Sequence, residues 1–84
     1  GKPAPDIYLY AAMQIGIEIT RTLIIEDSAV GVTGAVASGA HVVGLAVGQH
    51  CGPDHAAILR RAGAPVVVDE FEAINAMLEG RRAA

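Results

Sequence analysis

Thr22-Leu23-Ile24-Ile25-Glu26-Asp27-Ser28 is the stretch that decides the fold of this chain of 84 residues. Its apolar part predicts a short strand over residues 22–26, because consecutive large apolar residues suit a strand that is buried on both faces of a parallel sheet. Asp27 and Ser28 then break the strand, and Ser28 is a suitable N-cap for a helix. The stretch therefore predicts a β-strand that leads directly into a helix.

Helical and strand patterns alternate on both sides of this stretch. They predict helices over residues 5–15, 29–38, 53–62 and 71–78, and strands over residues 22–26, 41–46 and 64–68. Strands that alternate with helices pair in parallel through right-handed crossovers. We therefore predict an α/β fold with three layers, α/β/α, in which the first two strands are adjacent and parallel. Gly80 is expected to end the last helix and to leave residues 81–84 as a frayed tail.

The predicted core consists of apolar residues on these elements. It comprises Ile24, Ile25, Val36, Val42, Val43, Leu45, Val67 and Ile74. A sheet of only three strands is thin, and domains of this kind usually need more residues to bury both faces. We therefore expect the chain to be part of a larger domain, with one edge strand that needs a partner.

Composition excludes several classes of protein. Hydrophobic residues make up 52% of the chain and charged residues 18%, which argues against disorder. A net charge of −3 gives no electrostatic footprint for nucleic acid, and no apolar run is long enough to cross a membrane. The single cysteine suits a reducing compartment, so a cytoplasmic protein is expected.

Glu26 and Asp27 stand together where the first strand ends. Ligands bind at the carboxyl ends of the strands in open α/β sheets. Adjacent carboxylates repel each other, and a pair of this kind often holds a cation, for which Mg²⁺ is suited by its preference for oxygen ligands. The N-terminus of the next helix favours a phosphate group at the same place. The alternative is a pair of solvated acids at a strand end.

Lys2 lies in the second informative stretch, Gly1-Lys2-Pro3-Ala4-Pro5-Asp6. The two prolines stiffen the approach to the first helix and hold Ala4 extended. A lysine on such a segment has a fixed direction, and its ammonium suits a phosphate or a carboxylate cluster. The alternative is a solvated charge.

Together the two stretches resemble a known family. Lys2-Pro3-Ala4-Pro5-Asp6-Ile7-Tyr8, followed by Leu23-Ile24-Ile25-Glu26-Asp27-Ser28-x-x-Gly31, is similar to the haloacid-dehalogenase-like (HAD) phosphohydrolases. The similarity is greatest to the branch of β-phosphoglucomutase-like proteins and sugar-phosphate phosphatases. It covers nearly the whole chain, and it implies the C-terminal half of a Rossmann-like core domain over residues 1–84.

The resemblance assigns roles to four residues. Lys2 would neutralise the nucleophilic aspartate of the family and the phosphoryl group that it receives. Asp27 would bind Mg²⁺, Glu26 would bind or orient the metal and its waters, and Ser28 would cap the helix and support the metal shell. The implied activity is hydrolysis of a small phosphorylated metabolite through an aspartyl-phosphate intermediate.

Other motifs of the family do not occur in this sequence. It contains no Asp-x-Asp, so the nucleophile is missing, as are the Ser or Thr motif that binds phosphate and the cap that selects substrate. The expected partner is therefore the N-terminal half of the same protein, and the chain alone is expected to be inactive.

Alternative functions remain open at this point. Within the family they are a phosphoglucomutase-type phosphotransferase and a haloacid dehalogenase, although dehalogenases tend to replace the acidic pair by small polar residues. Outside it they are a receiver-like signalling module, in which Asp27 would accept phosphate, and a non-catalytic binding module.

Two further patterns are weaker. His50, Cys51 and His55 invite a zinc interpretation, but no second Cys/His pair completes the usual set of four ligands, and Cys51 has no clear partner as a nucleophile. Residues 44–48, with a glycine at each end, lack the spacing of a phosphate-binding loop.

Overall fold

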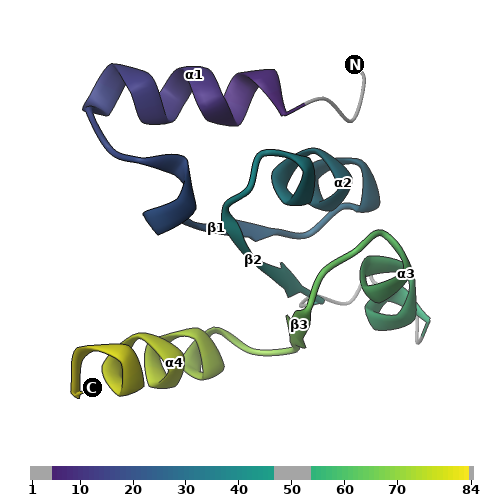
Figure 1. Ribbon diagram of the computed structural model, residues 1–84. Coiled ribbons are helices and arrows are strands. Elements are labelled where there is room, and N and C mark those ends of the chain that lie inside the picture. The colour runs from purple at the N-terminus through teal and green to yellow at the C-terminus, as the bar shows by residue number, and fades with distance from the viewer. Residues whose placement is uncertain (1–4, 47–53, 84) are drawn as a thin grey trace.

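The computed structural model describes residues 5–46 and 54–83. Its centre is a three-stranded parallel sheet in the order β1 (Leu23–Glu26), β2 (His41–Leu45) and β3 (Val66–Val68) (Figure 1). Ile24 pairs with Val42. The predicted parallel pairing of the first two strands is therefore confirmed.

The described residues also form four α-helices: α1 (Asp6–Ile15), α2 (Ala29–Ala37), α3 (His55–Arg61) and α4 (Phe71–Ala83). In Figure 1, α4 lies on the opposite side of the sheet from α1 and α2. The three-layer α/β/α arrangement is thus confirmed. A short 3₁₀ turn, Ile19–Arg21, lies between α1 and β1.

Local sequence explains where most helices begin and end. Gly16 follows α1 in the left-handed conformation, with φ of 73°, which glycine adopts without steric cost. Ser28 caps α2, because its hydroxyl accepts a hydrogen bond from the Gly31 amide at 3.0 Å. The expected end of the last helix at Gly80 is wrong, since α4 continues to Ala83. A glycine inside a helix costs only about 1 kcal/mol and does not by itself end one.

The main core lies between one face of the sheet and helices α2 and α3. Its buried members are Val32, Ala35, Val42, Leu59 and Ala64, with Ile24 and Val67 packed against them. Gly44 permits this close approach, because a Cβ at Gly44 would lie 3.2 Å from Leu59. Helix α3 can therefore lie directly on the middle strand.

The opposite face of the sheet is covered only in part. Val43 and, on α4, Ile74 are buried there, as predicted. Ile25 is 41% exposed, however, so its prediction as a core residue is wrong. The physical reason is its place on an edge strand, because α4 packs on β3 at the other edge of the sheet.

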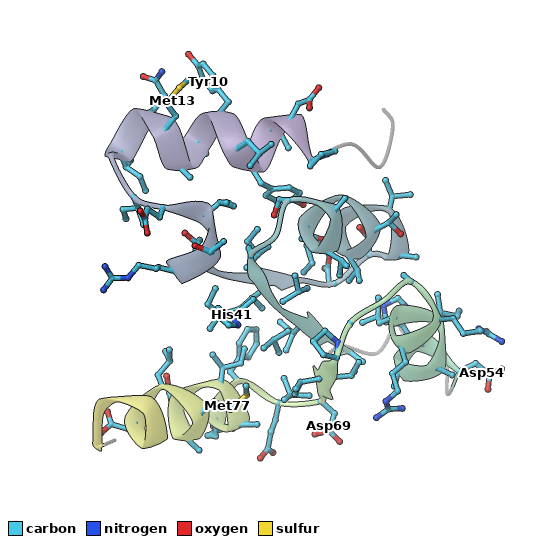
Figure 2. All side chains as sticks on the ribbon, in the orientation of Figure 1. Tyr10, Met13, His41, Asp54, Asp69 and Met77 are labelled. Carbon is cyan, nitrogen blue, oxygen red and sulfur yellow. The ribbon has the colours of Figure 1, made fainter. Side chains whose placement is uncertain are left out.

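A second core prediction also fails. Val36 is 40% exposed, because it lies near the C-terminal end of α2 beside Gly63 rather than over the sheet. Leu45 and Val67 are half-buried. Side chains also remain exposed on the outer face of α1, where Tyr10 and Met13 point away from the sheet (Figure 2).

The exposed edge strand leads to a prediction about the isolated polypeptide of 84 residues. In the described part of the chain β1 pairs with β2 alone, and apolar edges recruit other strands. We expect the isolated chain to self-associate, and we expect Ile25→Lys to reduce the associated fraction measured by sedimentation velocity. Ile7→Lys, on the outer face of α1, introduces the same charge away from the sheet and serves as the control. A monomeric wild-type chain, or equal effects of the two variants, would contradict this account.

Candidate active site at the carboxyl end of the first strand

The acidic pair lies at the edge of the sheet where all three parallel strands end. Glu26 is the last residue of β1, and α2 begins three residues later at Ala29. The structure thus places Glu26, Asp27 and Ser28 together in one tight turn between strand and helix. Glu26 is half-buried, whereas the side chain of Asp27 is exposed. Two adjacent carboxyl groups therefore occupy different environments.

The carboxylate of Glu26 is held by groups of the chain itself. The Tyr8 hydroxyl lies 3.2 Å from Oε1. The backbone amide and the hydroxyl of Ser28 lie 3.4 Å and 3.3 Å from Oε2. Both oxygens therefore accept hydrogen bonds from fixed donors, which orient the carboxylate.

Gly31 makes room for this carboxylate on α2. A Cβ at Gly31 would overlap the carboxyl group of Glu26. The close neighbour of Gly31 is thus the last side chain of the adjoining strand. Here the absence of a side chain compensates for the lower helix propensity of glycine.

Tyr8 connects α1 to the same carboxylate. Its hydroxyl lies within hydrogen-bonding distance of both Glu26 Oε1 and the Gly31 carbonyl oxygen, at 3.2 Å and 3.3 Å. Burial raises the pKa of Tyr8 above its ordinary value, and the charge and hydrogen bond of Glu26 raise it further. The sequence alone indicates no role for Tyr8, because its hydrogen-bond partners are 18 and 23 residues away along the chain.

His55 approaches the turn from α3. Its Nε2 lies 2.7 Å from the backbone carbonyl oxygen of Asp27. The sequence singles out His55 only as a member of the zinc pattern, and His50 and Cys51 lie outside the described residues. The sequence alone does not predict the contact between His55 and the acidic turn, because this contact joins residues 28 positions apart.

The described side chains do not form a complete set of protein ligands for a metal ion. Within residues 5–46 and 54–83, no group of three or more His, Cys, Asp or Glu side chains is placed to hold an ion. Magnesium, however, commonly takes only one or two protein carboxylates and completes its shell with water and phosphate. Glu26 and Asp27 fit such a partial shell. Lys2 lies outside the described residues, so its predicted position is not described.

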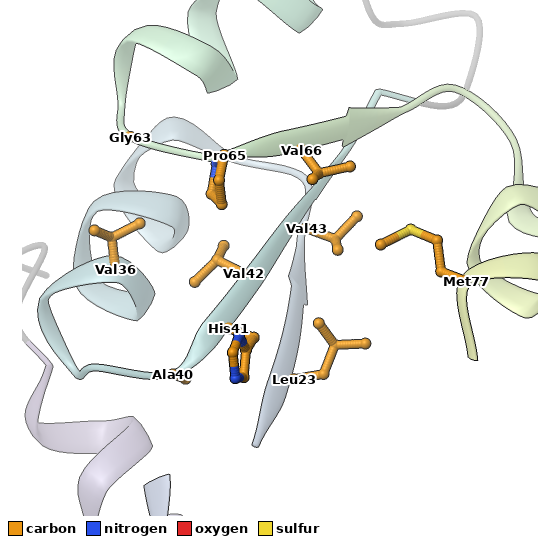
Figure 3. Close-up of a pocket in the computed structure, with 10 residues that line it drawn as sticks. All are labelled: Leu23, Val36, Ala40, His41, Val42, Val43, Gly63, Pro65, Val66 and Met77. Atoms are coloured by element: carbon orange, nitrogen blue, oxygen red, sulfur yellow. The ribbon is translucent and has the colours of Figure 1, made fainter. Parts of the chain in front are cut away.

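An apolar pocket occupies the opposite end of the sheet (Figure 3). Leu23, His41 and Val66, the first residues of the three strands, line it together with Met77 of α4. Since the acidic pair lies at the other end of β1, where Glu26 is the last residue, this pocket is not part of the candidate site. None of the helices in the described segments is long and apolar enough to cross a membrane.

The fold and the site define a class of protein: a parallel α/β domain with an acidic turn at the carboxyl end of its first strand, directly before a capped helix. The sequence matches the HAD-hydrolase-like family over residues 1–74. The chain belongs to this family, and the predicted resemblance is confirmed.

Individual members of the family are also similar to this chain. Hexitol phosphatase A of Escherichia coli is 38% identical over 45 residues, which are 54% of this chain and 21% of that protein. A HAD family hydrolase of Deinococcus radiodurans, solved with bound phosphate and sodium, is 45% identical with a TM-score of 0.82, over 93% of this chain and 34% of that one. A protein assigned to the β-phosphoglucomutases from Bacteroides vulgatus is 29% identical with a TM-score of 0.80, over 99% and 32% of the two chains.

These proteins support the predicted branch of HAD hydrolases and phosphatases. The chain spans about a fifth of the curated relative and about a third of the solved structures.

The contacts of Tyr8 predict how stability depends on pH. A folded-state pKa above the ordinary value of 10.0 means that protonated Tyr8 stabilises the fold at lower pH. This contribution is lost as the pH rises above 10 through the raised pKa. Tyr8→Phe should lower the free energy of unfolding by about 1 kcal/mol at pH 8 and remove this alkaline step. The measurement is urea unfolding of the complete protein at several pH values.

Tyr10→Phe is the matched control, because Tyr10 is 61% exposed on the same helix. It should leave both the stability at pH 8 and the alkaline step unchanged. Equal behaviour of the two variants would show that the bond between Tyr8 and Glu26 does not contribute to stability.

Proposed function

We propose that this chain is the C-terminal part of the core of a Mg²⁺-dependent phosphohydrolase that acts on a small phosphorylated metabolite. The observation that carries the proposal is the acidic turn, with an exposed carboxyl at Asp27 beside an oriented one at Glu26, at the carboxyl end of β1. Hexitol phosphatase A and the phosphate-bound hydrolase of Deinococcus radiodurans support this choice of substrate class.

In this proposal the two acids have different tasks. Asp27 would bind Mg²⁺ directly, because its side chain is exposed at the turn. Glu26, with both oxygens already accepting hydrogen bonds, would orient the waters around the metal. Bound Mg²⁺ supplies charge stabilisation to a phosphoryl group during transfer. Ser28 supports the arrangement by capping α2 and fixing Glu26.

The remaining groups would complete a phosphoryl-transfer site. Lys2 would neutralise the phosphoryl group and the carboxylate that attacks it. The attacking aspartate would come from a part of the protein outside this chain, since the sequence contains no Asp-x-Asp. Its carboxylate oxygen would bond to phosphorus while the bond to the ester oxygen breaks and the metabolite leaves as its alcohol. Water would then hydrolyse the aspartyl-phosphate to inorganic phosphate and the free aspartate. On this basis the N-terminal half is the essential partner, the chain alone is inactive, and the single cysteine suits a cytoplasmic location.

A phosphoglucomutase-type transfer is the second candidate, and the likeness to the Bacteroides vulgatus protein supports it. Both reactions would use the same four residues and differ in whether water or a sugar hydroxyl accepts the phosphoryl group. Release of inorganic phosphate from hexose and hexitol phosphates distinguishes them, because a mutase converts one sugar phosphate into another.

Asp27→Asn in the complete protein tests the proposed metal site. It should lower Mg²⁺-dependent phosphate release by at least about 100-fold, because it removes a charged ligand of the metal. The thermal unfolding midpoint should remain unchanged, since the side chain of Asp27 is exposed.

Asp69→Asn is the matched control. Asp69 directly follows β3, so it also lies at the carboxyl ends of the strands, and its side chain is exposed. The substitution therefore removes an equal charge two strands away from Asp27. Its activity should equal that of the wild type. Full Mg²⁺-dependent activity of Asp27→Asn, or an equal loss in both variants, would remove Asp27 from the site.

A further inference from the structure

His55 makes a contact that links the third helix to the acidic turn. It is the first residue of α3, it is half-buried, and its Nε2 lies 2.7 Å from the carbonyl oxygen of Asp27. A carbonyl oxygen only accepts hydrogen bonds, so Nε2 must carry the proton and donate it. The imidazole is therefore bound to the backbone of the exposed acid and not to its carboxyl group.

The turn is consequently held from two sides. On the side of α1, Tyr8 and Ser28 fix the carboxylate of Glu26. On the side of α3, His55 fixes the peptide group of Asp27. The side chain of Asp27 is exposed, so packing restrains it little, and its position depends on the backbone that carries it.

We propose that His55 is a positioning residue that sets the direction of Asp27 by holding its carbonyl oxygen. This inference rests on the proposed function, in which Asp27 binds Mg²⁺. Groups that orient a metal ligand contribute to metal affinity without touching the ion. This role requires only a hydrogen-bond donor at the position of Nε2. A replacement of His55 that keeps such a donor should therefore keep the affinity for Mg²⁺.

Three variants of the complete protein separate positioning from packing. His55→Phe keeps a flat ring and removes the donor. His55→Gln removes the ring and keeps an N–H group at a similar distance from the backbone. His41→Phe is the control, because His41 is exposed at the start of β2, the opposite end of the sheet. Thermal unfolding of each variant shows whether it folds.

The first readout is the affinity for Mg²⁺ alone, measured by isothermal titration calorimetry. His55→Phe should weaken it by about 10-fold, in the range found for residues that support metal ligands. His55→Gln should remain within about threefold of the wild type, because it restores one donor. His41→Phe should match the wild type.

The second readout is the NMR signal of the Ser28 amide, which belongs to the same peptide group as the Asp27 carbonyl. This signal should shift in His55→Phe and return towards the wild-type position in His55→Gln. Unchanged Mg²⁺ affinity in a folded His55→Phe, or equal losses in the phenylalanine and glutamine variants, would overturn the proposal.

The outcomes also distinguish this inference from the proposed function. A wild-type protein that binds Mg²⁺ but releases no phosphate from any sugar phosphate overturns the proposed function alone. In that case, weakened Mg²⁺ binding by His55→Phe still supports the positioning role. A wild-type protein that binds no Mg²⁺ overturns both.

Discussion

The site depends on the close contact between the Glu26 carboxylate and the backbone of Gly31. Three elements meet there: β1 supplies the acid, α2 supplies the glycine and the Ser28 cap, and α1 supplies the Tyr8 hydroxyl. A half-buried carboxylate is costly unless donors compensate for the lost water, and these groups provide them. The same donors fix the direction of the Glu26 carboxylate. One set of contacts therefore joins the three elements and also orients an acid of the turn.

Parallel topology explains why these contacts gather at one edge of the sheet. Every strand ends there, and the helix that follows β1 begins beside the acids. Helix α3 begins at the same edge, which brings His55 to the Asp27 carbonyl. Residues from α1, the turn and α3 therefore converge on three consecutive positions.

Sequence patterns predicted the elements because their signals are local. An apolar run, a serine cap and a glycine after a helix each act within a few residues, and β1, α1 and α2 lie within about one residue of their predicted bounds. Ile25 was predicted incorrectly because its exposure depends on which elements cover the sheet. The sequence indicates no role for Tyr8 and places His55 only in the zinc pattern, because the contacts of both residues join distant segments. The roles of Lys2, Glu26 and Asp27 as site residues remain predictions.

A double-mutant cycle between Gly31→Ala and Glu26→Ala tests the central contact most directly, with the free energy of unfolding of the complete protein as the readout. In the Glu26→Ala background, Gly31→Ala should stabilise α2 by up to about 1 kcal/mol, because alanine is the better helix former. In the wild-type background the new methyl group displaces the carboxylate from its donors, so the same change should be less favourable by about 1–2 kcal/mol. An identical effect of Gly31→Ala in both backgrounds would show that the carboxylate does not rest on Gly31.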